Sequence, residues 1–198
     1  MGALRILIAE DEPLSAMALQ SQLEALGHEV VGRAGTGREA VELARQHTLD
    51  LAILDIRMPV MNGIDAAREI FRTTPIPIIL LSGYSDPEYI AAATVGPVFQ
   101  YLVKPVSLED LGPAISVARK RFDEWRQFRG EAAALEQKLE DRKVIERAKG
   151  ILMEARGLSE NDAYRTLQRE SQNRHQSMVE IARTILMAED LLRDHPGT

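Results

Sequence analysis

The 198-residue sequence predicts an α/β fold with a doubly wound, five-stranded parallel sheet, followed by an all-helical half. Two observations lead to this prediction. Up to about residue 106, short apolar runs alternate with segments of helical periodicity, which is the pattern of consecutive βα units. Beyond residue 106 the strand pattern stops, and apolar residues recur at spacings of three and four.

The five apolar runs are continuous rather than alternating, as expected for parallel strands buried on both faces. They predict strands at 5–9, 29–33, 51–55, 77–81 and 99–103. Helices are expected at about 13–26, 38–47, 63–73, 86–95 and from 107 onward. Right-handed crossovers would distribute these helices over both faces of the sheet.

The last of these helices carries an apolar seam that is interrupted once. Residues spaced by three and four reach Trp125, the pattern slips at Phe128, and it then resumes through Ala132, Leu135 and Leu139. Such a seam predicts a coiled coil with a stammer. The spacing leaves open whether the helix pairs with a second copy or packs against C-terminal helices of its own chain.

The C-terminal part predicts a compact bundle of three helices with short connections. Gly157 is suited to end the long helix, and Ser159 with Asp162 to begin another near residue 160. The segment from Ser177 to Glu180 has the pattern of a capping box for a last helix. A bundle of this size leaves little room for an enzyme pocket, and no catalytic constellation occurs in it.

Composition narrows the classes of function. Because the chain has no cysteine, disulfides and thiol catalysis are excluded. Its apolar stretches are shorter than a membrane span and it begins without a signal-peptide pattern, so we expect a cytoplasmic protein. Residues 1–118 carry 8 Lys and Arg against 15 Asp and Glu, whereas residues 119–198 carry 16 against 15. This asymmetry suggests different partners for the two halves.

Acidic residues end two of the predicted strands. Glu10, Asp11 and Glu12 follow the first strand, and Asp55 closes the third. Because parallel strands present their carboxyl ends at one edge of a sheet, we expect these side chains to meet there. Carboxylates that close together repel unless a cation is shared, and Mg²⁺ prefers such oxygen ligands.

Two further strand ends would complete a phosphoryl site. Ser82 ends the fourth strand, and Lys104 follows the fifth. A lysine can neutralise an anion at this edge and a hydroxyl can hydrogen-bond to it. With Mg²⁺ and the nucleophile Asp55, these groups would stabilise the charge of a transferred phosphoryl group.

Residues 1–120 resemble the receiver domain of two-component response regulators, which has the flavodoxin-like fold. The resemblance lies in the acidic pair, the segment from Leu54 to Pro59, Asn62-Gly63, Ser82, and Tyr101 with Lys104-Pro105. It implies that a sensor histidine kinase phosphorylates Asp55, and that Lys104-Pro105 is a cis peptide. It also implies that Mg²⁺ is bound by Glu10, Asp11, Asp55 and the Arg57 carbonyl. Ser82, Tyr101 and Lys104 would respond to the phosphoryl group.

Gly150 lies within a strong helical pattern, where it costs about 1 kcal/mol relative to Ala. Either close helix packing or the close approach of a ligand would account for it. Residues 135–190, which include the segment from Ala148 through Lys149 and Gly150 to Met153, resemble the ANTAR domain, an RNA-binding antitermination module. The implied binding face for RNA hairpins of nascent transcripts comprises Lys143, Arg147, Ala148, Lys149, Gly150, Arg165, Ser171, Arg174 and His175.

We therefore expect a receiver domain at 1–120, a coiled-coil linker at 121–140 and an ANTAR domain at 135–198. The expected function is phosphorylation-controlled transcription antitermination rather than enzymatic catalysis. Phosphorylation or RNA would promote a homodimer, since paired hairpins match two modules. A helical output that docks on a protein, or that binds DNA, is the alternative. DNA is less expected because the last helix carries few basic residues.

Overall fold

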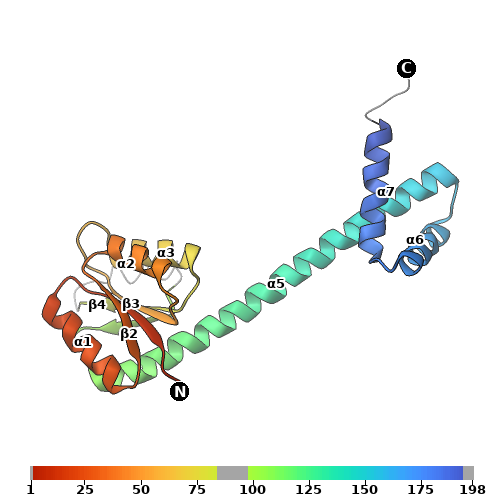
Figure 1. Ribbon diagram of the computed structural model, residues 1–198. Helices are drawn as coiled ribbons and strands as arrows, with labels where there is room; N and C mark the ends of the chain where they lie inside the picture. The colour runs from red at the N-terminus through yellow and green to blue at the C-terminus, as the bar shows by residue number, and fades with distance from the viewer. Residues whose placement is uncertain (1, 84–97, 194–198) are drawn as a thin grey trace. The chain divides into compact units, whose positions relative to one another are not determined.

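A computed structural model describes residues 2–83 and 98–193 and contains the predicted five-stranded parallel sheet (Figure 1). The strand order is β2-β1-β3-β4-β5. The strands are β1 Arg5–Ala9, β2 Glu29–Ala34, β3 Leu51–Asp55, β4 Ile78–Ser82 and β5 Gln100–Val103. Each predicted strand is confirmed to within one residue at either end. The fold class is therefore the one the sequence predicted.

The sheet is covered on both faces, which explains why its central strands are continuously apolar. On one face, Leu7 of β1 and Leu54 of β3 pack with helices α2 (Gly37–Gln46) and α3 (Gly63–Thr73). On the other face, Ile8 and Ile53 pack with α1 (Pro13–Ala25) and the first part of α5 (Leu108–Arg156). The helix predicted at 86–95 falls outside the described residues.

Polar side chains begin the helices on the first of these faces. The hydroxyl of Thr36 accepts a hydrogen bond from the N–H of Glu39 at the start of α2. At the start of α3, the side chain of Asn62 accepts one from the N–H of Asp65. These caps satisfy backbone donors that have no partner inside the helix.

The long helix α5 belongs to two compact units, Met1–Arg126 and Gln127–Thr198. In the first unit, Leu111, Ile115 and Phe122 of α5 are buried against the sheet. Beyond the boundary, Phe128, with 68 % of its surface exposed, is the first apolar residue of the resumed seam. The phase slip that the sequence shows at Phe128 therefore coincides with the boundary between the two units, where the apolar face of α5 leaves the core of the first unit. Up to Phe122 the apolar face of α5 packs on its own chain rather than on another copy.

An aromatic cluster fastens α5 to the first unit. Phe71 of α3, Phe99 just before β5, and Phe122 and Trp125 of α5 have ring centroids 4.8 to 6.4 Å apart. Arg121 donates a hydrogen bond to the carbonyl of Phe99 at 3.0 Å. Trp125 is the single tryptophan of the chain, so its fluorescence reports on this unit.

The second unit contains the predicted three-helix bundle, formed by the end of α5 with α6 (Glu160–Arg174) and α7 (Met178–Arg193). Gly157, with a φ of 63°, follows the last residue of α5, as predicted. Ser159 caps α6, and Ser177 and Glu180 form the predicted capping box of α7. The small core of the bundle consists of Ala148, Leu152, Ala163, Leu167, Ile181 and Ala182.

Among the described residues, no helix combines the length and the apolar character that crossing a membrane requires.

Candidate functional site

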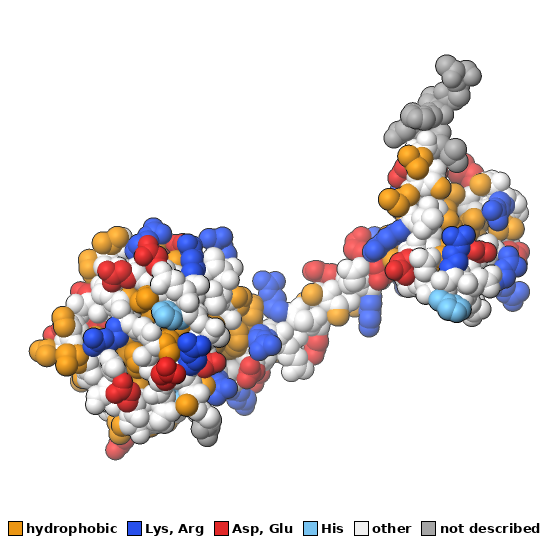
Figure 2. Space-filling model, viewed as in Figure 1, with side chains coloured by type: hydrophobic (Ala, Val, Ile, Leu, Met, Phe, Trp, Pro, Cys, Tyr) orange, Lys and Arg blue, Asp and Glu red, His pale blue; other side chains and the backbone are white. Residues whose placement is uncertain are grey.

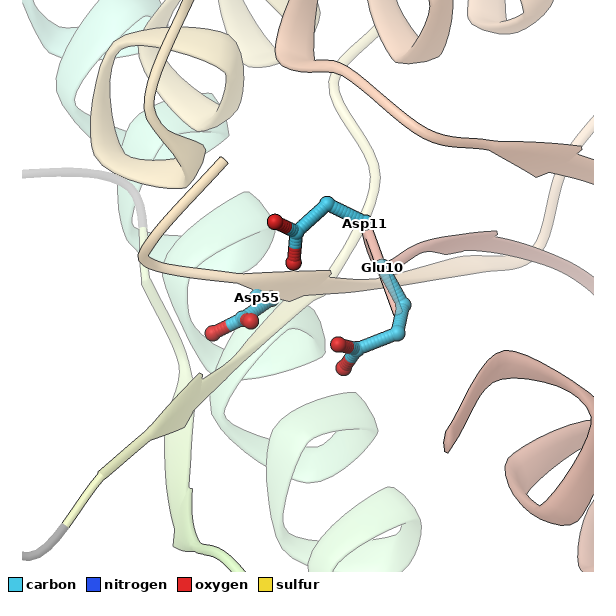
Figure 3. Close-up of side chains that lie close together, drawn as sticks. All are labelled: Glu10, Asp11 and Asp55. Carbon is cyan, nitrogen blue, oxygen red and sulfur yellow. The ribbon is translucent and has the colours of Figure 1, made fainter. Parts of the chain in front are cut away.

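The carboxyl ends of β1 and β3 bring three acidic side chains together. Glu10 and Asp11 directly follow β1, and Asp55 is the last residue of β3. These strands are neighbours, with Ala9 paired to Leu54. One oxygen from each of the three carboxylates lies within 4.8 Å of the others. Figure 3 shows the three side chains converging from the two strand ends.

Lys104 is the cation of this cluster. Its Nζ lies 2.7 Å from Oδ2 of Asp55 and also contacts Oε2 of Glu10. Burial by itself lowers the pKa of Lys104, but the hydrogen bonds to Asp55 and Glu10 outweigh it and the pKa is raised. The pKa of Glu10 is also raised, because burial and the nearby Asp55 outweigh the hydrogen bond from Lys104. Lys104 thus pairs with two of the three carboxylates, Glu10 and Asp55, and one positive charge does not balance the three acidic groups.

The donor set fits a hard divalent cation. Glu10 and Asp55 are only 4 % and 5 % exposed, whereas Asp11 is exposed and open to an incoming ion. Carboxylate oxygens at this spacing are the ligands that Mg²⁺ takes in proteins. The N–H of Arg57 donates to Oδ1 of Asp55 at 3.3 Å, which holds the loop after β3 against the same carboxylate.

This loop approaches the backbone of Asp55 so closely that only glycine fits at its end. A Cβ on Gly63 would lie 2.0 Å from the carbonyl oxygen of Asp55. The N–H of Gly63 instead donates to the carbonyl of Ile56 at 2.9 Å. Val60, in the same loop, has a φ of 69°, a conformation that a β-branched residue rarely adopts. The loop is therefore held in a specific conformation beside Asp55.

Ser82 and Tyr101 lie on β4 and β5, adjacent strands of the sheet. Ser82 is 1 % exposed, and its hydroxyl donates to the carbonyl of Leu102 at a long 3.5 Å. The buried hydroxyl of Tyr101 has no hydrogen-bond partner among the described residues. Burial raises the pKa of Tyr101. The Ser82 hydroxyl is thus weakly hydrogen-bonded, and that of Tyr101 has no partner in the part of the chain that the structure describes. The Lys104-Pro105 peptide is cis, as expected.

A hollow of about 450 Å³ opens beside the acidic cluster. It lies between α1 and the segment that follows β5, and Glu10 and Lys104 line it together with Gln22 and Val106. The Nε2 of Gln22 donates to the carbonyl of Val106 across this hollow. Glu10 and Lys104 of the cluster therefore border this hollow.

In the second unit, Ala148 belongs to the core of the bundle, and the neighbouring Lys149 pairs with two carboxylates. Ala148 is fully buried and Lys149 is 6 % exposed. The Nζ of Lys149 lies 2.8 Å from a carboxylate oxygen of Glu146 and 2.8 Å from one of Glu160. These hydrogen bonds outweigh burial and raise the pKa of Lys149. Lys149 thus ties α5 to the first turn of α6.

Gly150, by contrast, is exposed, and a Cβ there would meet nothing within 4 Å. Close helix packing therefore does not account for this glycine. Ser171 is half-buried, and its hydroxyl donates to the carbonyl of Gln176 at 2.6 Å, closing the turn between α6 and α7. The other residues of the expected RNA face are exposed: Lys143, Arg147, Arg165, Arg174 and His175. On the visible face of the second unit, Lys and Arg side chains are interspersed with Asp and Glu (Figure 2).

The sequence interpretation did not identify Glu146 and Glu160 as partners of Lys149. The spacing of Glu146 and Lys149, three residues along a helix, was a signal for the first pair. The contact with Glu160 joins two helices, so periodicity within one helix contains no sign of it.

Comparison with known proteins gives matches to both units. The family model of the response regulator receiver domain matches residues 6–116, and that of the ANTAR domain matches residues 133–186. The transcriptional regulatory protein PdtaR of Mycobacterium tuberculosis is 45 % identical over 182 residues, covering 92 % of this chain and 89 % of PdtaR. The chemotaxis protein CheY of Thermotoga maritima is 37 % identical over 102 residues, covering 51 % of this chain and 85 % of CheY.

Among solved structures, the signal receiver domain of a modulated diguanylate cyclase from Desulfovibrio desulfuricans is similar to the first unit. The TM-score is 0.58 at 33 % identity, covering 61 % of this chain and 97 % of that domain. The likeness to PdtaR, in contrast, extends through both units.

Proposed function

Because this chain belongs to the response regulators that join a receiver domain to an RNA-binding ANTAR output, we propose that Asp55 is the phosphoacceptor that controls this output. The supporting observation is the arrangement of Asp55 between two other carboxylates and the ammonium of Lys104. A carboxylate oxygen of Asp55 would attack the phosphorus of a phosphohistidine on a sensor kinase, and the histidine would leave. Phosphorylation adds roughly −1.5 to −2 charge at this position.

Each neighbour of Asp55 has a part in this reaction. Lys104 would move its ion pair from the carboxylate to the phosphoryl oxygens. Ser82, with its long hydrogen bond, has a hydroxyl that can turn toward the new acceptor. Glu10, Asp11, Asp55 and the Arg57 carbonyl would hold Mg²⁺, which neutralises phosphoryl charge when bound. Tyr101, whose hydroxyl is unpaired among the described residues, would follow Ser82 as the switch.

A phosphotransfer assay tests the acceptor. Asp55→Asn keeps the size of the side chain and removes the nucleophile, so labelling by a phosphodonor such as acetyl phosphate should be lost. Glu12→Gln is the matched control, because the exposed carboxylate of Glu12 accepts a hydrogen bond from Ser15, and only the backbone N–H, which the substitution keeps, contacts Glu10. Labelling of Asp55→Asn at the wild-type rate would mean that another residue is the acceptor.

For the output, we propose that the ANTAR unit binds RNA hairpins of nascent transcripts and favours an antiterminator. Exposed Lys143, Arg147 and Arg165 would meet phosphates, and the open side of Gly150 would admit a loop base. Lys149 would act indirectly, because its ammonium is held by Glu146 and Glu160. Two hairpins would be bound by a homodimer, whose affinity gains from the linkage of two modules.

A gel shift with a two-hairpin leader RNA, with and without Mg²⁺ and beryllium fluoride, tests the output. We expect RNA binding that strengthens with this mimic of phosphorylation and exceeds binding to duplex DNA at the same salt. Arg147→Ala should weaken the complex, whereas Arg72→Ala, an equal loss of exposed charge on α3, should not. Equal affinity for both variants and wild type would place the RNA face elsewhere.

A further inference from the structure

A short row of apolar side chains on α5 lies outside every core formed by the described residues. Phe128, Leu135 and Leu139 are 68 %, 61 % and 53 % exposed, and the small Ala132 completes the row. Spacings of four, three and four residues place all four on one side of the helix. Most of the stability of a helix in a protein comes from packing its apolar side, so we expect a second helix to bury this row.

Charged residues flank the row on both sides. In the heptad defined by Phe128, Ala132, Leu135 and Leu139, one flank carries Arg129, Glu136 and Lys143, and the other carries Glu131 and Lys138. The part of α5 that holds these residues is solvent-exposed, with charges of both signs (Figure 2). The charge of the side chains therefore changes sign along each flank.

These flanks distinguish the two possible directions of pairing with a second copy. In a parallel pair, one flank faces the opposite flank of the other helix, five residues further on. Glu131 would then face a second Glu136, and Lys138 a second Lys143. Like charges at such positions destabilise a helix pair.

In an antiparallel pair, each flank faces its own counterpart. In this register, Phe128 packs against Leu139 of the second copy, and Ala132 packs against its Leu135. On one flank, Glu131 then meets Lys138 of the second copy. On the other flank, Arg129 meets its Glu136. By the two-fold symmetry each contact occurs twice, so all four contacts join opposite charges. The core layers also match a large side chain with a small one where Leu135 meets Ala132.

We propose that a second copy of this chain pairs antiparallel along this row, about a two-fold axis between Ala133 and Ala134. The inference rests on the homodimer of the proposed function and adds its direction. The phosphorylated, RNA-bound dimer then presents its two ANTAR units at opposite ends of the paired segment. The RNA partner would accordingly be two separated hairpins rather than two adjacent ones.

Charge reversal gives opposite results for the two directions. In the antiparallel pair, Glu131→Lys places a lysine opposite Lys138 of the other copy, and the two-fold symmetry repeats this contact. The two like-charge contacts should raise the dimer dissociation constant about tenfold. Adding Lys138→Glu restores opposite charges and should return it to the wild-type value. In a parallel pair, Glu131→Lys instead meets Glu136 and would tighten the dimer, and the double variant would tighten it further.

The measurement is sedimentation equilibrium of the full chain with Mg²⁺, beryllium fluoride and the two-hairpin RNA. Gln137→Lys, which adds charge on the outer side of the helix, is the control and should leave the dissociation constant unchanged. A tighter dimer for Glu131→Lys would overturn the antiparallel direction while the dimer itself stands. A monomer under every condition would overturn both the dimer and its direction.

Distances between spin labels provide a second measurement, because the chain has no cysteine of its own. Gln127→Cys and Ala134→Cys, seven residues apart, place a nitroxide at equivalent positions around the helix. In a parallel dimer, the label-to-label distances of the two variants would be similar. In the antiparallel dimer, labels at 127 should be about 18 Å further apart along the axis than labels at 134.

Discussion

Leu167→Ala should destabilise the ANTAR unit selectively, because that unit has a core of its own. Leu167 is fully buried among only a few apolar side chains of α5, α6 and α7. The substitution removes three carbons, worth about 2.4 kcal/mol at about 0.8 kcal/mol each. With the cavity left behind, we expect a loss of about 3 kcal/mol. A unit of roughly 70 residues has a free energy of unfolding of roughly 4–11 kcal/mol.

The assay follows thermal unfolding by two signals. Far-ultraviolet circular dichroism reports all helices, whereas the fluorescence of Trp125 reports the aromatic cluster of the receiver unit. Leu167→Ala should lower the temperature of the helical transition, weaken RNA binding near that temperature, and leave both the Trp125 transition and phosphotransfer unchanged. Leu191→Ala, at a leucine that is 72 % exposed, is the control and should change stability by about 0.5 kcal/mol or less.

Two results would refute this reasoning. If the Trp125 transition moved as far as the helical one, the two units would not unfold separately. If Leu167→Ala cost no more than Leu191→Ala, the bundle would not depend on the core seen in the structure.

Other perturbations test the remaining parts of the structure. Gly63→Ala should slow phosphotransfer, because the added Cβ would lie 2.0 Å from the carbonyl oxygen of Asp55. Gly112→Ala is the control and should leave the rate unchanged, because a Cβ there meets nothing within 4 Å. Equal rates for the two variants would refute the close approach at Gly63. His28 has a lowered pKa through burial and the nearby Arg119, so its contribution to stability is present above pH 6.5 and is lost as the pH falls through the folded pKa. Trp125 fluorescence should therefore show the receiver losing stability as the pH falls below about 6.5, and losing less in His28→Gln. Ser177→Ala should cost the bundle about 1 kcal/mol by removing the cap of α7, which chemical denaturation measures.

The sequence by itself determined the α/β fold and the convergence of Glu10, Asp11 and Asp55. Buried parallel strands are recognisable from their own continuous apolar runs, and their order then places the strand ends at one edge of the sheet. Helix starts such as Ser159 and Ser177 were equally predictable, because a cap is a local interaction between residues three apart.

Only the tertiary structure decided what the helical faces contact. Periodicity shows that α5 is apolar on one side, but the same spacing serves a sheet, a bundle or a second chain. The structure assigns Leu111 to Phe122 to the sheet and leaves Phe128 to Leu139 exposed. It likewise holds Lys149 between Glu146 and Glu160. The sequence placed this lysine on the expected RNA face, whereas in the structure its ammonium joins α5 to α6. Such pairings depend on residues brought together from different helices, and the free energy of those contacts is not encoded in any one segment.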